Sequence, residues 1–457
     1  MMETVHTVLA FIFAIAVLVT VHEYGHFIVA RKLGIRVEKF SIGFGPAIFS
    51  WRGKDGEVEY VIAAIPLGGY VKMLGENLDE QGERQLEGQG EQLSETELAR
   101  AYHVQAVWKR ASVAAAGPIF NFIFAIVAYM MVAWLGQNVM PPIVGNVLPG
   151  SVAERAGLMA GDVLKSVNGN GVVSWQQFEE SLKETVGKEV DIVYTRQDMP
   201  VSVTMPVKEF EQDALLVNVS EDGLGLGLGT LVFIDSVIPS SPADRAGLMP
   251  GDQIIQIEGK DVATVRALIR SIQQHAGKPL TLGVLRADTY LQLSVVPKAG
   301  ADPGVGRMGV HLMAKPLSDP IIYRMGLWEG VAYGFTRTVE MTVLTVQVLG
   351  KMITSAISPD NLGGPIAIAQ LAGRTADLGL AAFITFLALI SVNLGVLNFL
   401  PIPILDGGHL VYLTLEKLRG KPLSVMMMER MQLLGMLLIA ALMTFAFYND
   451  LMRLFRG

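Results

Sequence analysis

A metal-binding pattern lies inside an apolar stretch that is long enough to cross a membrane. The stretch runs from Thr7 to Ala30, and as a helix it would be about 36 Å long. Within it, His22 and His26 frame Glu23 in the pattern His-Glu-x-x-His. Residues four apart share one face of a helix, so both imidazoles can bind one zinc ion beside which Glu23 stands. A third ligand has to come from elsewhere in the chain.

Ionisable groups inside a segment of this length are costly, and they persist mainly where they carry function. The alternative interpretation is a helix end whose histidines only anchor it at the membrane interface. Such an anchor needs neither Glu23 nor a fixed spacing of four residues between His22 and His26. The pattern therefore favours a metal site.

The composition indicates a membrane protein with soluble modules. Of the 457 residues, 51% are hydrophobic, and the chain is too long for one compact domain. The formal charge is −7, and eight acids against two arginines lie between Gly75 and Arg100. Residues 75–105 are therefore predicted to form an acidic cytoplasmic linker, and the charge argues against a nucleic-acid partner. The chain has no cysteine, which excludes thiolate zinc ligands and cysteine nucleophiles.

Four apolar segments are predicted to span the membrane, namely residues 1–31, 106–135, 378–408 and 430–449. The N-terminus carries Glu3 in place of the basic cluster of a signal peptide, so the first segment is expected to stay attached. Basic residues follow the first span, precede the second and separate the last two, which predicts that these ends are cytoplasmic. Both termini and the region between the second and third spans then lie outside.

Two other regions are predicted to contact the membrane. Residues 40–74 alternate strand-like runs with glycine and proline, and an apolar sheet there could lie against lipid. A small cytoplasmic sheet without a substrate role remains the alternative. Residues 317–358 carry an apolar stripe opposed by Arg337 and Lys351, which favours helices in the membrane surface. A spanning helix there would invert the topology downstream and also stays open.

An internal repeat begins after the second span. Residues 153–162 recur as residues 243–252 with eight of ten positions identical. The repeated Ala-Gly-Leu-x-x-Gly-Asp segment resembles the core of bacterial PDZ domains, so two tandem PDZ domains are expected over residues 142–208 and 222–299. PDZ domains bind extended peptides at a sheet edge. The glycine-alternating run at residues 223–229 could supply backbone amides for a peptide carboxylate in the second domain, unless it is only a flexible connection.

The third ligand should lie at the cytoplasmic end of the third span, where the chain has the pattern Asn-x-x-Pro-x-Pro-x-Leu-Asp-Gly. Pro401 and Pro403 cannot sit in a regular helix, so the span is expected to break just before Asp406. This break would bring the Asp406 carboxylate to the depth of His26. Asp-Gly-Gly also reads as a plain turn. His409 is the second candidate for the third ligand.

Taken together, these motifs resemble the site-2 protease family of intramembrane zinc metalloproteases, peptidase family M50. The resemblance implies an α-helical polytopic membrane protein with four transmembrane helices, a membrane-associated β-hairpin that pairs with the substrate, and two periplasmic PDZ domains. It also marks Gly363-Gly364-Pro365 as a family segment before the third span. The site residues that it implies are His22, His26 and Asp406 as Zn²⁺ ligands, Glu23 as general base, and Asn398, Pro401 and Pro403 for substrate binding.

The resemblance implies cleavage of transmembrane segments in single-span proteins of the bacterial inner membrane. The expected substrates are an anti-sigma factor already cut on its outer side, in an envelope stress response, and remnant signal peptides. Membrane lipid and peptide ligands of the PDZ domains are the other expected partners. A membrane scaffold that uses its PDZ domains without catalysis is the alternative from a different class. A metal transporter fits less well, because only one constellation of buried ligands is evident.

Overall fold

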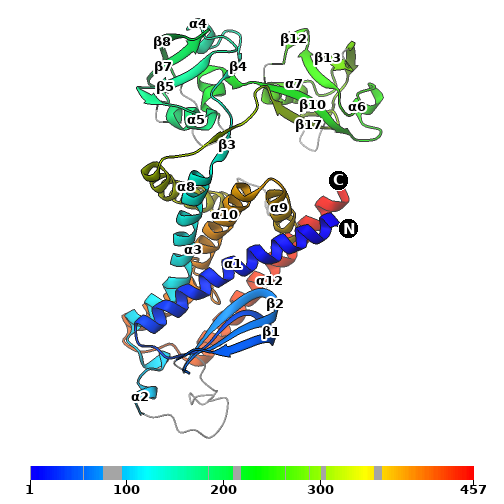
Figure 1. Cartoon of the computed structure of the whole chain (residues 1–457). Helices are drawn as coiled ribbons and strands as arrows, with labels where there is room; N and C mark the ends of the chain where they lie inside the picture. The colour runs from blue at the N-terminus through cyan, green and yellow to red at the C-terminus, as the bar shows by residue number, and fades with distance from the viewer. Residues whose placement is uncertain are drawn as a thin grey trace. The chain divides into compact units, whose positions relative to one another are not determined.

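The structure is a computed structural model that describes residues 2–54, 56–75, 95–183, 185–208, 218–262, 264–287, 289–299, 305–354 and 363–456. Most of the predicted acidic linker, residues 76–94, lies outside the described chain, and its last part contains the short helix α2 (Glu95–Leu98). The chain divides into two compact units (Figure 1). Met1–Gln137 and Arg324–Gly457 form the membrane unit, and Asn138–Tyr323 form the two-lobe unit.

Four long apolar helices build the membrane unit: α1 (Met2–Lys32), α3 (Val107–Leu135), α10 (Leu380–Asn398) and α12 (Val425–Arg456). Within the described residues, these are the helices long and apolar enough to cross a membrane, as predicted. Helix α3 packs against both α1 and α10, where Tyr129 and Val392 are buried in one cluster. Phe13 and Val127 stay exposed, as is expected of side chains that face lipid.

Three further helices of more than ten residues belong to the membrane unit: α8 (Leu327–Ile353), α9 (Pro365–Asp377) and α11 (Asp406–Arg419). Helix α8 packs against α3 and α10 and is not among the candidate spans of the described chain. Within the predicted helical region 317–358, Ile321–Tyr323 instead form strand β18, which pairs with β3 (Gln137–Val139). Helix α9 was not predicted. At the N-terminus of α9, the backbone amides of Gly364 and Ile366 donate hydrogen bonds to the Asp450 carboxylate of α12.

The region predicted to be strand-like forms an antiparallel hairpin of β1 (Val37–Arg52) and β2 (Glu59–Met73). Near α1 the hairpin is anchored by a buried cluster that includes Phe27, Phe40 and Val71. The hairpin also exposes a set of large apolar side chains, namely Phe44, Ile48, Phe49, Trp51, Ile62, Ile65 and Tyr70. Apolar surface of this kind is typical of contact with a membrane or a partner.

The two-lobe unit contains two similar series of elements, one in each lobe. The first lobe has β4 (Val144–Val147), α4 (Val152–Arg155), β5 (Val163–Val167), β6 (Asn170–Gly171), α5 (Trp175–Lys183), β7 (Glu189–Arg196), β8 (Met199–Pro206), η2 (Val219–Leu224) and β9 (Leu226–Leu228). The second has β10 (Thr230–Val237), α6 (Pro242–Arg245), β11 (Gln253–Ile257), β12 (Lys260–Asp261), α7 (Val265–Gln274), β13 (Leu280–Arg286), β14 (Thr289–Val295), β15 (Lys298–Ala299), β16 (Gly306–Arg307) and β17 (Val310–Pro316). Each lobe has its own apolar core.

Matched polar contacts show that the sequence repeat is also a structural repeat. Arg196 binds Asp162 in the first lobe, and Arg286 binds Asp252 in the second, each pair through two hydrogen bonds of 2.7 Å. Both pairs occupy positions 90 residues apart. Each arginine also donates to a glycine carbonyl in the turn that carries the aspartate: Arg196 donates to Gly157, and Arg286 donates to Gly247. The repeated Gly-Asp segment is therefore needed for a buried carboxylate that ties a turn to a strand.

The lobe boundaries differ from the predicted ones. The glycine-alternating run belongs to the first lobe, because β9 pairs with β4 and Leu224 and Leu226 lie in the first core. In the second lobe the equivalent strand is β17, which pairs with β10. Gly225 and Gly309 are the matching glycines. Both have positive φ, and a Cβ at either would lie within 2.3 Å of the Cβ of Ser151 or Ser241.

Replacing Asp252 with asparagine should destabilise the second lobe. Burial raises the pKa of the Asp252 carboxyl, but the bonds from Arg286 and from the Met249 amide outweigh burial and hold that pKa below its ordinary value. Its stabilisation is therefore complete above the ordinary aspartate pKa of about 3.9 and is lost as the pH falls through the lowered value. We expect the Asp252→Asn substitution to lower the free energy of unfolding of the second lobe by about 2 kcal/mol. This loss is smaller than for a fully buried ion pair, because the Arg286 side chain is 31% exposed.

Hydrogen exchange of the full chain in detergent measures this loss at the amides of β11 and β13. Asp235→Asn, at an exposed position on β10, is the matched control. Equal protection of β11 in both variants would contradict a structural role of Asp252.

Candidate metal centre

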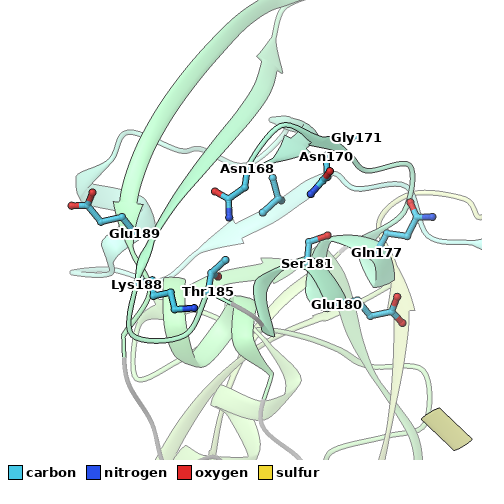
Figure 2. Close-up of a pocket in the computed structure, with 10 residues that line it drawn as sticks. Asn168, Asn170, Gly171, Gln177, Glu180, Ser181, Thr185, Lys188 and Glu189 are labelled. Atoms are coloured by element: carbon cyan, nitrogen blue, oxygen red, sulfur yellow. The ribbon is translucent and has the colours of Figure 1, made fainter. Parts of the chain in front are cut away.

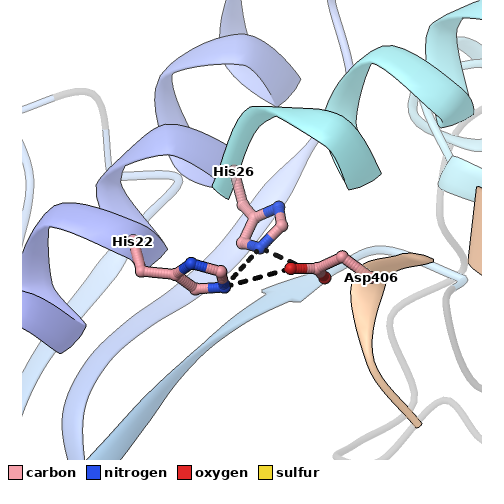
Figure 3. Close-up of side chains that lie close together, drawn as sticks. All are labelled: His22, His26 and Asp406. Atoms are coloured by element: carbon pink, nitrogen blue, oxygen red, sulfur yellow. Dashed lines mark hydrogen bonds and ion pairs between the residues drawn. The ribbon is translucent and has the colours of Figure 1, made fainter. Parts of the chain in front are cut away.

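The structure brings two histidines and one carboxylate from distant parts of the chain to one point. His22 and His26 lie on one face of α1, and Asp406 is the first residue of α11 (Figure 3). The two Nε2 atoms are 3.2 Å apart, and they lie 3.2 and 3.5 Å from the Asp406 carboxylate oxygens. One ligand atom from each residue falls within 4.8 Å of the others, the one such group found in the described chain. This is the predicted set of three.

Asp406 reaches this point because the chain breaks after α10. Between Asn398 and Asp406 there is no regular helix, as Pro401 and Pro403 predict. Ile404 has φ of +104°, an unfavourable conformation for a β-branched residue, which indicates local strain beside the site. A glycine is required at position 407, where α11 starts directly against the preceding loop. A Cβ there would lie 2.2 Å from the Leu400 carbonyl oxygen.

Hydrogen bonds behind the imidazoles leave both Nε2 atoms available. His26 Nδ1 lies 2.8 Å from the Val113 carbonyl oxygen, which can only accept, so Nδ1 carries the proton and Nε2 keeps its lone pair. His22 Nδ1 lies 3.1 Å from the side-chain amide of Asn121, whose oxygen is buried without a partner as placed. Turning that amide lets its oxygen accept from His22 Nδ1–H, which gives the same tautomer. Two imidazole lone pairs and a carboxylate are a donor set suited to zinc.

Helix α3 forms the floor of the centre. Val113, Gly117 and Asn121 are spaced by four residues, so they lie on one face of the helix. A Cβ on Gly117 would lie 2.3 Å from His26 Nε2 and 2.7 Å from His22 Cε1. The space for the two rings therefore depends on the absence of a side chain. The sequence prediction missed these residues, although a Gly-x-x-x-Asn spacing inside an apolar span was a visible signal.

A cavity of about 290 Å³ opens onto the centre. Besides the three candidate ligands it is lined by Glu23, Asn398 and His409, and by Gly69, Tyr70 and Val71 of strand β2. His409, the second candidate ligand, thus faces the cavity but is not part of the group of three. Pro401 and Pro403 are not among the lining residues and serve the path of the backbone. The cavity therefore places the candidate general base, Glu23, next to an edge of strand β2.

A larger cavity of about 470 Å³ lies in the first lobe, between α5 and the β5–β6 turn (Figure 2). Its lining consists of amides, hydroxyls and a few charged groups, among them Asn168, Asn170, Ser181 and Lys188. It holds none of the described metal-ligand groups. Cavity size alone therefore does not single out the candidate metal centre in this chain.

The sequence profile of peptidase family M50 matches residues 10–442, a range that includes all three candidate ligands. The chain belongs to peptidase family M50. Among its relatives, protease RseP of Yersinia pestis is 38% identical over 99% of this chain and 100% of its own length. The regulator of sigma-E protease RseP of Escherichia coli is 37% identical, with 97% and 98% covered. The predicted resemblance to the site-2 protease family is thereby confirmed.

A solved PDZ domain of an SdrC-like protein from Listeria monocytogenes is similar to a part of this M50 peptidase. The identity is 24%, the match covers 18% of this chain and 85% of that domain, and the TM-score is 0.17.

Proposed function

We propose that this M50 peptidase is an intramembrane zinc metalloprotease that cleaves transmembrane segments of single-span membrane proteins. The observation that carries the proposal is the meeting of His22, His26 and Asp406 in a cavity that also contains Glu23. A scaffold without catalysis has no use for this arrangement. This convergence requires His26 of α1 and Asp406 of α11, which are 380 residues apart in the sequence, to be brought together by folding.

The residues have separate tasks in this proposal. His22, His26 and Asp406 would hold the zinc ion, and all three line the cavity through which a substrate would reach it. When bound, zinc lowers the pKa of a coordinated water to about 7 and polarises a carbonyl oxygen. Glu23 accepts the proton of the attacking water and returns it to the leaving amine. Asn121 and the Val113 carbonyl keep both imidazoles in the tautomer that binds metal.

Strand β2 and Asn398 are the proposed substrate contacts. A transmembrane helix hides its carbonyls in hydrogen bonds, so the segment must unwind before a peptide bond can be attacked. Gly69, Tyr70 and Val71 of β2 line the same cavity as Glu23, and strand addition there would take up the freed backbone groups. The Asn398 amide, which lines the cavity as well, can hold a substrate backbone group in place.

The proposed setting is the bacterial inner membrane, with the two lobes and both termini outside and the metal centre toward the cytoplasm. Arg31 and Lys32 at the end of α1 support this orientation. The full-length similarity to sigma-E regulators supports an anti-sigma factor as substrate, and remnant signal peptides are a second proposed class. The lobes are proposed to be PDZ domains that take peptides along β9 and β17, next to Gly225 and Gly309.

Removing the metal separates the protease from the scaffold. Dialysis of the detergent-purified chain against a zinc chelator should abolish cleavage of a single-span substrate, and added Zn²⁺ should restore it. Peptide binding to the lobes should survive chelation, because no metal-ligand group lies among their described residues. A chain that cleaves equally well with and without zinc would overturn the proposed function.

A further inference from the structure

The face of α3 that forms the floor of the metal centre carries one further contact, which Arg110 makes. Arg110 precedes Val113 by three residues, and Gly117 and Asn121 follow at intervals of four. All four therefore lie along one stripe of the helix. Val113, Gly117 and Asn121 contact the histidines of α1, whereas Arg110 contacts α11.

The contact is a two-pronged ion pair between Arg110 and Glu416. The guanidinium nitrogens donate to the two carboxylate oxygens at 2.5 and 3.1 Å, and Arg110 Nε also donates to the Gln105 carbonyl at 3.0 Å. The side chains are only 13% and 17% exposed. An exposed ion pair contributes little to stability. This pair is shielded and holds the guanidinium through three bonds, so its orientation is determined.

Glu416 lies on the same helix as the third ligand. Helix α11 begins at Asp406 and ends at Arg419, so Glu416 follows Asp406 by ten residues on one rigid rod. The N-terminus of α11, where Asp406 lies, is preceded by the irregular loop from Phe399 to Leu405. That loop contains Ile404 in its unfavourable conformation, and it is held by turn hydrogen bonds such as that from the Leu405 amide to the Ile402 carbonyl at 3.0 Å, not by a regular helix or strand. Helix α11 packs mainly against α3.

We propose that the Arg110–Glu416 ion pair positions α11 so that Asp406 meets the two imidazoles, which makes both residues positioning residues for the metal. The inference rests on the proposed function, since it assigns Asp406 to zinc. Through this pair, α3 sets the place of all three ligands. Val113 and Asn121 of α3 hold the two histidines. Arg110, in the first turn of α3, holds the Asp406 carboxylate in place through Glu416 and α11.

The test measures zinc affinity and helix position separately. Arg110→Gln and Glu416→Gln should each weaken zinc binding about tenfold in a chelator competition. The exchange Arg110→Glu with Glu416→Arg should restore the affinity to within about threefold. Glu340→Gln, which breaks the Arg337–Glu340 pair on α8, is the matched control and should leave the affinity unchanged.

A second readout does not need the metal. The chain lacks cysteine, so spin labels on cysteines placed at the exposed Lys32 and Leu418 report only the distance between the ends of α1 and α11. Arg110→Gln should broaden that distance distribution, and the exchanged pair should narrow it again. Unchanged zinc affinity and an unchanged distribution in Arg110→Gln would overturn the inference. If the unaltered chain binds no zinc, the proposed function fails, while the distance measurement still decides whether the pair positions α11.

Discussion

Replacing Glu23 with glutamine is expected to lower the cleavage rate by about 10²–10⁴-fold while the protein keeps its zinc. Glutamine has nearly the size of glutamate but cannot accept the proton of the attacking water. Glu23 lines the cavity beside His22, His26 and Asp406 but is not one of the three grouped ligands. Removal of its charge should therefore affect the reaction and leave the metal in place. Single-turnover cleavage in proteoliposomes and the metal content of the purified protein measure the two effects.

The matched control for this experiment is Glu340→Gln, which removes a carboxylate from the half-exposed face of α8. It should cleave at the rate of the unaltered chain. A scaffold predicts that Glu23→Gln behaves like this control. Loss of zinc together with activity in Glu23→Gln would instead mean that Glu23 helps to hold the metal, which the three-ligand assignment does not allow.

The three candidate ligands could be predicted from the sequence because each has a local signature. His22 and His26 are four residues apart in an apolar helix, and Asp406 follows two prolines that end another. The prediction that they meet rested on the expectation that both helix ends lie at the same depth in the membrane. The tertiary structure then added distances that a sequence does not contain.

The floor of the site was missed because its contributions are not carried by reactive side chains. Val113 acts through its backbone carbonyl, and Gly117 acts through the absence of a Cβ. Helix α9 was missed for a related reason, since its N-terminal amides are capped by Asp450, which lies more than 80 residues further along the chain. Only three-dimensional packing reveals such partners.

The glycine-alternating run was assigned to the wrong lobe because the repeat changes its register. Between Asp162 and Asp252 the offset is 90 residues, but the matching glycines Gly225 and Gly309 are 84 residues apart. Only Gly309 in the second copy keeps the positive φ beside a serine, and the rest of the glycine alternation is absent there. A repeat that loses both its spacing and its composition gives no sequence signal of which lobe it completes.

Replacing Gly117 with alanine is expected to weaken zinc binding by about 100-fold and to remove cleavage with it. The added Cβ would lie 2.3 Å from His26 Nε2, a distance that no real contact allows. The ring cannot simply turn away, because His26 Nδ1 is bonded to the Val113 carbonyl on the same helix. Either that bond breaks or α1 and α3 separate, and each outcome moves Nε2 away from Asp406.

The alternative explanation of such a loss is general damage to the helix packing, and a second glycine, on another helix of the membrane unit, distinguishes the two explanations. Gly350 lies near the end of α8, and a Cβ there would meet no atom within 4 Å. Alanine also has the higher helix propensity, so Gly350→Ala should keep both zinc and activity. If Gly117→Ala unfolds at the same temperature as Gly350→Ala in the metal-free state but binds zinc far more weakly, the defect lies in the space for the imidazoles. Full zinc affinity in Gly117→Ala would mean that the rings have another position from which they bind the metal, and the geometry described for His22 and His26 would then be wrong.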